Sequence, residues 1–448
     1  VVTTAIPVIR AHLGASLTSL EWTVNAYTLT FAVLLLTGAA LGDRFGRRRL
    51  FALGVGTFTA GSVAAALAPS IAVLNLARAV QGLGGSIVLP LTLTILSAAV
   101  PASKRGLALG TWGGISGLAV ALGPVVGGAI VQASTWQWIF WLNVPIGAAL
   151  VPLAMSRLTE TYGPAGRLDL PGLALSATGL FGIVWGLVRG NTQGWASTDI
   201  LTALTCGAAL LAGFVAWEQH TRHPMLPMRQ FRSAPFTLAN TASLFMYFGM
   251  FGSIFLLAQF FQIVQGYSPL GSGLRILPWT IAPMVISPAA GALSDRVAGR
   301  TLIGTGLTLQ AAGLAWLGLV ATPAMPYAAF AGPFLLAGTG MGLFFAPMAN
   351  VVLSAVAPSH EGKASGANNA IRELGGVFGV AVLAAVFARF GGYHTGHTFV
   401  AGMKPAILLG AAAVAAGAAA AFAIPHGRRV TGTPQPDVAE PAGELTAL

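Results

Sequence analysis

Long hydrophobic runs follow one another along almost the whole chain, separated by short connections that carry charge, glycine or proline. An α-helix needs about 20 apolar residues to cross the hydrocarbon core of a bilayer, so we interpret each run as one membrane span. The pattern predicts fourteen spans, the first of them partial, at roughly residues 1–12, 22–42, 50–68, 72–98, 106–131, 137–156, 168–188, 200–217, 236–264, 271–293, 301–320, 327–355, 364–388 and 404–424.

The connections between the runs predict how the chain is oriented. Basic residues gather in every second connection, as they do in cytoplasmic loops. The strongest case follows the second run, where Arg44, Arg47, Arg48 and Arg49 stand close together. We therefore expect both termini in the cytoplasm and the loop 189–199 outside. The polar segment 425–448 is expected to be a disordered cytoplasmic tail.

Composition narrows the class of protein further. Hydrophobic residues make up 55% of the chain and charged residues 8%, whereas a soluble domain has about 25% charged residues. The net charge of +11 follows from the basic loops, so we expect no nucleic-acid partner. The single cysteine, Cys206, excludes an intrachain disulfide and a cysteine metal cluster. Because no nucleotide-binding loop, metal-ligand spacing or nucleophile–base pair stands out, we expect neither an enzyme nor a metal or other cofactor.

An internal repeat divides the chain. The stretch GAALGDRFGRRRL at 38–50 returns in shortened form at 291–300 as GALSDRVAGR. Repeats of this kind are typical of transporters built from two related halves. The predicted domains are a six-helix half at 1–156, an inserted two-helix segment at 157–235, a second six-helix half at 236–424 and the tail at 425–448.

Six stretches together resemble a known family. The three signature stretches of major facilitator drug:proton exporters are similar to GAALGDRFGRRRL (38–50), LARAVQGLGGSIVLP (76–90) and GISGLAVALGPVVGGAI (114–130). Bacterial fourteen-span multidrug antiporters resemble the chain at WQWIFWLNVPIG (136–147), QGYSPLGSGLRILP (265–278) and IRELGGVFGVA (371–381). The likeness covers nearly the whole chain, in order.

The resemblance implies an all-α polytopic membrane protein with the major facilitator fold, in which two halves alternately expose a midplane cavity. It implies a proton-coupled antiporter of the bacterial plasma (inner) membrane that exports hydrophobic or amphipathic small molecules such as drugs and antibiotics. The proton gradient takes the place of a cofactor, and the expected partners are the lipid bilayer, the substrate and protons. We expect one chain to function as a monomer. The alternatives are an exporter dedicated to one metabolite or self-made antibiotic, and a transport-dead membrane sensor of the same fold.

The stretch after the second run and its repeat carry candidate gate residues. Asp43 and Asp295 each end a span, where a carboxylate is either a solvated loop charge or a partner for the free amides at the start of a helix in the other half. The resemblance implies the second role for Asp43, against the helix expected to begin near Ala364. The candidate cytoplasmic gate comprises Gly38, Gly42, Asp43, Arg44, Gly46, Arg47, Asp295 and Arg296.

Glycines and a proline crowd the fifth run. Pro124 lacks the amide that would bond the carbonyl of Val120, so a bend is expected there. The glycines serve either tight helix packing alone or a bend and contact surface between the halves. The candidate residues are Gly113, Gly117, Gly123, Pro124 and Gly127.

Polar residues at helical spacing within the runs predict a cavity lining, because such groups turn from hydrocarbon toward water or a partner. The candidates are Asn25, Tyr27, Asn75, Gln81, Trp112, Asn143, Gln259, Gln262, Asn350 and Asn369.

Three charged residues within the runs are candidates for proton coupling: Arg78, Arg372 and Glu373. Arg78 is either a structural arginine bonded to backbone carbonyls or, as the resemblance implies, a residue that lowers the pKa of a nearby carboxyl. We expect that carboxyl in a part of span one that precedes Val1, with Glu373 as the alternative within the chain. Arg372 and Glu373 form either a structural ion pair or part of the coupling machinery.

Overall fold

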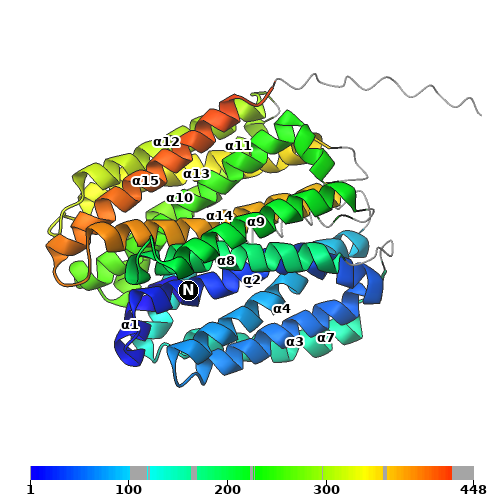
Figure 1. Cartoon of the computed structure of the whole chain (residues 1–448), viewed down its shortest axis with the longest axis horizontal. Coiled ribbons are helices and arrows are strands. Elements are labelled where there is room, and N and C mark those ends of the chain that lie inside the picture. The colour runs from blue at the N-terminus through cyan, green and yellow to red at the C-terminus, as the bar shows by residue number, and fades with distance from the viewer. Residues whose placement is uncertain are drawn as a thin grey trace, which may run out of the picture.

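Long α-helices that run side by side make up the protein (Figure 1). The computed structural model describes residues 2–100, 119, 122–162, 169–221, 224, 226, 228–294, 296–356 and 361–425, and within these ranges there is no β-strand. Eleven of the helices described are long and apolar enough to cross a membrane. The all-helical architecture expected from the hydrophobic runs is confirmed.

The order of the helices follows the hydrophobic runs. The first part of the chain forms α1 (Val2–Leu13), α2 (Leu17–Phe45), α3 (Arg47–Ala66), α4 (Ile71–Ala99), the helix Leu122–Ala133, α6 (Trp138–Trp141) and α7 (Asn143–Arg157). The middle forms α8 (Leu170–Gln193), α9 (Thr198–His220) and the 3₁₀ turn η2 (Met228–Arg232). The last part forms α10 (Ala234–Gln259), the π-helical turn η3 (Phe260–Val264), α11 (Pro269–Leu293), α12 (Gly299–Val320), α13 (Ala328–Ser354), α14 (Glu361–Phe390) and α15 (Gly396–Phe422).

The run predicted as one span at 137–156 is divided in the structure. Helix α6 ends at Trp141 and α7 begins at Asn143, with Leu142 between them. Pro145 lacks the amide that would bond the carbonyl of Trp141, so the ladder of hydrogen bonds is interrupted at this point. The two helices together form one candidate span, Trp138–Arg157, which agrees with the run predicted at 137–156.

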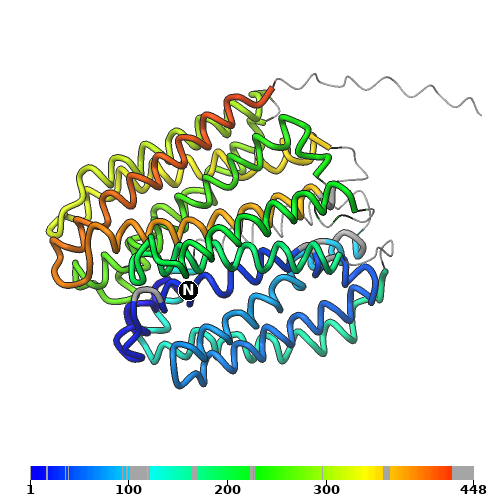
Figure 2. The backbone as a smooth tube through the Cα atoms, viewed as in Figure 1, coloured from blue at the N-terminus to red at the C-terminus, as the bar shows by residue number. Residues whose placement is uncertain are grey.

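The helices pack in two groups that share one pattern of neighbours. In the first group α4 packs on α2 and α3, and α3 packs on α7. In the second group α13 packs on α11 and α12, and α12 packs on α15. Figure 2 shows the blue and cyan helices together on one side of the molecule and the yellow to red helices on the other. The domain boundaries themselves stay predictions.

Helices α8 and α9 pack on each other, and α8 lies across α2 and α14, one helix from each group (Figure 1). This contact is apolar. A single buried cluster joins Leu180, Val184 and Val188 of α8 to Leu29 and Val33 of α2 and to Val377 and Ala381 of α14. We call the junction of α2 and α14 the seam, and α8 covers one side of it.

Candidate functional site

Arg78 is buried in the first group of helices and is fully engaged there. Its Nε donates to the carbonyl of Thr23 at 3.0 Å, and its Nη1 donates to Oε1 of Gln81 at 2.9 Å. Its Cζ lies 4.3 Å from the ring centroid of Tyr27, a cation–π distance. The guanidinium on α4 is therefore held against α2 by a hydrogen bond and by an aromatic ring together.

The other polar candidates on α4 and α7 extend this arrangement. Gln81 donates to Oγ of Ser62 at 2.6 Å, and Asn143 donates to the same oxygen at 3.3 Å. Asn75 accepts from Oγ1 of Thr23 at 2.9 Å and donates to the carbonyl of Ser19 at 3.0 Å. In this conformation the side chains link helices of one group to each other, and their role as cavity lining stays a prediction.

The second group contains a matching arginine. The Cζ of Arg372 on α14 lies 4.5 Å from the ring centroid of Tyr247 on α10 and 5.9 Å from that of Phe345 on α13. Arg372 also donates to the Tyr247 hydroxyl and, at 3.2 Å, to Oδ1 of Asn369. One turn away, Asn368 donates to Asn240 and Ser243 of α10, both at 3.0 Å. Each group thus packs an arginine against a tyrosine of a neighbouring helix.

Tyr27 connects the two arginines across the seam. The charges of Glu373 on α14 and of Arg78 on α4 both act on the Tyr27 phenol. Glu373 also interacts electrostatically with its neighbour Arg372. The three residues predicted to couple protons therefore lie in one chain of interacting groups, which runs from Arg78 through Tyr27 and Glu373 to Arg372.

A second set of contacts joins the two groups at the end of the bundle where α1 meets α10. Gln262 donates to the carbonyl of Thr4 at 2.8 Å, and Gln259 accepts from the Tyr393 hydroxyl at 2.5 Å. Tyr393 belongs to the connection between α14 and α15, and the guanidinium of Arg10 lies 3.8 Å from its ring centroid. Burial raises the pKa of the Tyr393 hydroxyl, so it stays protonated and donates. We call this set the α1-end contacts.

The remaining cavity candidates differ in their surroundings. Asn25 is fully buried, and neither atom of its side-chain amide has a hydrogen-bond partner in the described part of the chain. Asn350 on α13 is exposed. Trp112 lies outside the described residues.

The basic turn between α2 and α3 is tied to the segment that follows α7. Asp43 is bonded to Arg47, four residues on, with Oδ1 2.8 Å from Nη2. Glu160 accepts from the backbone amide of Arg48 at 2.9 Å and lies 3.6 Å from Nε of both Arg48 and Arg49. The contact predicted between Asp43 and the start of α14 stays a prediction, because the side chains of residues 361–363 are not described.

Glycines allow α2 and the turn after it to approach α4 and the Glu160 carboxylate closely. Gly46 has φ +103°, and a Cβ there would lie 2.8 Å from the Glu160 carboxylate. A Cβ at Gly38 would meet the backbone of Ser86 on α4, and one at Gly42 would meet Leu91. Of the other gate candidates, Arg44 lies 5.2 Å from the ring of Phe45, Arg296 is exposed and Asp295 lies outside the described residues.

The end of the fifth predicted span touches the second group. Gly273 of α11 lies against the carbonyl of Pro124, and Gly128 lies against the start of α11 at Pro269 and Leu270. Small residues thus bring the helix Leu122–Ala133, which also contains Gly123 and Gly127, backbone to backbone with α11. Gly113 and Gly117 lie outside the described residues, and the bend at Pro124 stays a prediction.

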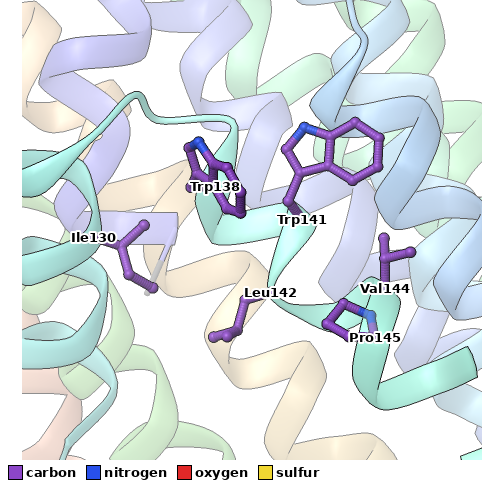
Figure 3. A pocket seen from close by; sticks show the side chains of 6 residues that line it. All are labelled: Ile130, Trp138, Trp141, Leu142, Val144 and Pro145. Carbon is purple, nitrogen blue, oxygen red and sulfur yellow. The ribbon is translucent and has the colours of Figure 1, made fainter. Parts of the chain in front are cut away.

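A pocket of about 360 Å³ lies at the break between α6 and α7, lined by Ile130, Trp138, Trp141, Leu142, Val144 and Pro145 (Figure 3). Its lining is apolar, and Trp138 and Leu142 are 54% and 43% exposed. It lies on the outside of the bundle, where it has none of the polar groups of the seam.

Sequence reasoning missed Glu21, Glu160 and Tyr393. Glu21 and Glu160 stand at the ends of hydrophobic runs, where a carboxylate is usually a solvated loop charge. The available signal was the spacing of Glu21 and Asn25, four residues apart and therefore on one helix face. Tyr393 lies in a connection, and nothing in its local sequence marks it.

Comparison with known proteins agrees with this architecture. A family model described as Major Facilitator Superfamily matches residues 1–380. The chain is 35% identical over 390 residues to the multidrug resistance protein Stp of Mycobacterium tuberculosis (strain CDC 1551 / Oshkosh), covering 87% of this chain and 72% of that protein. It is 32% identical over 391 residues to the tetracenomycin C resistance and export protein of Streptomyces glaucescens, covering 87% and 72%. It is 35% identical over 390 residues to the methylenomycin A resistance protein of Streptomyces coelicolor (strain ATCC BAA-471 / A3(2) / M145), covering 86% and 81%.

Solved structures share the fold at low sequence identity. The human organic anion transporter MFSD10 aligns with a TM-score of 0.60 at 15% identity, covering 94% of this chain and 89% of that one. A POT family transporter in complex with 5-aminolevulinic acid aligns with a TM-score of 0.68 at 14% identity, covering 93% and 91%.

Proposed function

Because the chain belongs to the Major Facilitator Superfamily, as its six sequence stretches indicated, and is a multi-pass membrane transporter rather than an enzyme, we propose that it is a proton-coupled antiporter. In this proposal it exports hydrophobic or amphipathic small molecules from the cytoplasm. The two groups of helices rock against each other and expose a site at the seam to one side of the membrane at a time. The basic turn Arg44–Arg49 faces the cytoplasm.

The observation that carries the proposal is the chain of charged and phenolic groups across the seam. Arg78, Tyr27 and Glu373 come from both groups of helices and interact where α2 packs on α14. A carboxyl held between an arginine and an apolar helix surface exchanges its proton when a neighbouring positive charge moves. Rocking the groups changes the distance between Glu373 and Arg78, and this links the protonation of the carboxyl to the conformation.

Efflux from vesicles tests the proposal. Purified protein is reconstituted into liposomes with a fluorescent amphipathic dye, and dye transport is followed with and without an imposed pH gradient. We expect dye movement against its own gradient only when protons flow in the opposite direction. Equal transport with the gradient collapsed by an ionophore would show a uniporter, and no transport of any compound would favour a transport-dead sensor.

The names of the relatives support two different substrate ranges, which an experiment can distinguish. Stp is named for multidrug resistance, whereas the two Streptomyces proteins are named for resistance to one antibiotic each. The names of the two Streptomyces proteins support the alternative of an exporter dedicated to one compound. A susceptible bacterial host that expresses the protein, challenged with a panel of unrelated antibiotics and dyes, discriminates the two. Rescue from several structural classes supports broad specificity, and rescue from a single class supports the dedicated exporter.

A further inference from the structure

Two polar side chains of α2 are buried near the α1-end contacts without the partners that buried polar groups normally have. Glu21 is 2% exposed and Asn25 is fully buried. Oε2 of Glu21 and both amide atoms of Asn25 have no hydrogen-bond partner in the described part of the chain. Because the two residues are four apart, their side chains share one face of the helix. This face therefore holds several polar atoms that no described residue satisfies.

An ionised carboxylate in these surroundings is costly. Moving a charge out of water without a partner costs several kcal/mol or more, and the usual outcome is that the group takes up a proton. Ionisable groups stand on the elements packed against α2: Arg10 and His12 on α1, Arg47, Arg48 and Arg49 on α3, Arg78 on α4, Arg189 on α8, Arg372, Glu373 and Arg389 on α14, and Tyr393 in the following connection. Among the described residues, none of these arginines forms an ion pair with Glu21. Arg78 is bonded to Thr23 and Gln81, and Arg189 is stacked on Trp185.

Tyr393 stands next to the carboxyl and belongs to the other group of helices. The charges of Glu21 and Arg10 both act on its hydroxyl, so all three groups are close together. The Tyr393 ring is fixed by Phe387 and Phe399, with ring centroids 5.3 and 5.6 Å away. Its hydroxyl donates to Gln259 of α10. Tyr393 therefore lies near Glu21 while the α1-end contacts are intact.

We propose that Glu21 and Asn25 form a proton-binding site at the α1 end of α2, and that Glu21 carries a proton in the closed conformation seen here. The carboxylic acid is stable while Tyr393 excludes water. When the α1-end contacts separate, water from the outer side reaches the carboxyl and exchanges protons with it: the O–H bond breaks when a proton passes to water and forms again when one is taken up. While the carboxyl is ionised, its charge is free to pair with Arg10. The role of this site in coupling rests on the antiport function proposed above, whereas its protonation does not.

Carbodiimide labelling tests the protonation directly. Dicyclohexylcarbodiimide reacts with protonated carboxyls in apolar surroundings, and peptide mass spectrometry identifies the residue that carries the adduct. We expect the adduct at Glu21 at neutral pH and none at Asp199, an exposed carboxyl at the start of α9. Tyr393→Phe keeps the ring contacts and removes the hydrogen bond to Gln259. This variant is expected to make Glu21 reactive toward a water-soluble carbodiimide as well. Absence of the adduct at Glu21, or equal reaction at Asp199, overturns the proposal.

Transport by liposomes tests the role in coupling. We expect Glu21→Gln to lower pH-gradient-driven efflux at least about tenfold, while substrate exchange without a gradient stays within about twofold of wild type. Glu21→Asp keeps the carboxyl and is expected to recover part of the driven efflux, and Asp199→Asn is the matched control with wild-type behaviour. Wild-type driven efflux by Glu21→Gln overturns the role of Glu21 in coupling. Should the wild-type protein itself show no driven efflux, the antiport function fails, and the labelling alone decides whether Glu21 binds a proton.

Discussion

The guanidinium of Arg78 on α4 lies 4.3 Å from the ring centroid of Tyr27 on α2, and its Nε donates to the backbone of the same helix at Thr23. Arg78 therefore stabilises the packing of α4 on α2, and it also lies next to the seam. The backbone bond supports the structural interpretation of this arginine, and its contact with Tyr27 beside the seam supports the coupling interpretation. Arg78→Ala removes the charge, whereas Arg78→Lys keeps the charge and changes the planar shape, so the two substitutions can distinguish the structural role from the coupling role.

Arg78→Ala is expected to lower gradient-driven efflux at least about tenfold while the protein still reaches the membrane and binds substrate. Arg78→Lys keeps the charge but loses the planar group that bonds Gln81 and Thr23, so it is expected to retain partial activity. Membrane content by immunoblot and dye efflux in the same vesicles are the two measurements. Arg189→Ala is the matched control, since Arg189 is also stacked on an aromatic ring, that of Trp185, but belongs to the inserted pair. Loss of Arg78→Ala from the membrane would support the purely structural role.

Glu373 and Arg78 are expected to act as a unit through Tyr27. Glu373→Gln should abolish the dependence of efflux on the pH gradient, and Tyr27→Phe should weaken it, because the phenol interacts with both charges. In a double-mutant cycle, Glu373→Gln combined with Arg78→Lys should cost less than the sum of the single effects. Strict additivity of the two free-energy changes would show that the groups on the two sides of the seam are independent.

Gly46 is expected to be hard to replace. Gly46→Ala puts a Cβ into a conformation with φ +103° and against the Glu160 carboxylate, which should destabilise the protein by about 1–3 kcal/mol. Gly56→Ala is the control: a Cβ at that position on α3 meets nothing within 4 Å, so a gain of about 0.5–1 kcal/mol is expected from helix propensity. Thermal unfolding in detergent compares the two. An unchanged melting temperature for Gly46→Ala would mean that the turn relaxes freely.

Single-cysteine labelling checks the orientation. In a Cys206→Ser background, needed because Cys206 is exposed, a cysteine at Gly194 is expected to react with an impermeant reagent added outside the cell. A cysteine at Ser233, before α10, is expected to react only after the membrane is permeabilised. The opposite pattern would reverse the assignment of the basic turn to the cytoplasm.

The helices could be predicted from the sequence because burial in a bilayer requires long apolar runs, and such runs are visible without any knowledge of contacts. The same holds for residues that share a helix face, such as Asn75 and Arg78. Partners far apart in the chain could not be predicted: nothing local indicates that Asn143 bonds Ser62 or that Glu160 lies over Gly46. These contacts depend on which helices become neighbours.

Isolated charges were the most difficult to interpret. Glu21 stands at the end of a run and is not among the site residues predicted from the sequence, yet it is among the most deeply buried charged side chains described. The difference comes from α2, which begins at Leu17 rather than at residue 22, so that Glu21 lies within the helix and near Tyr393.

The apolar cluster beneath α8 has a mechanical consequence. Leu180, Val184 and Val188 pack on both α2 and α14, so α8 is anchored to both of the groups that rock in the proposed mechanism. Each apolar contact that slides apart during rocking costs about 25 cal/mol per Å² of surface returned to lipid or water, at most. In the proposed rocking mechanism we expect α8 to resist the separation of α2 from α14, and we expect the size of the side chains at these three positions to influence the speed of turnover.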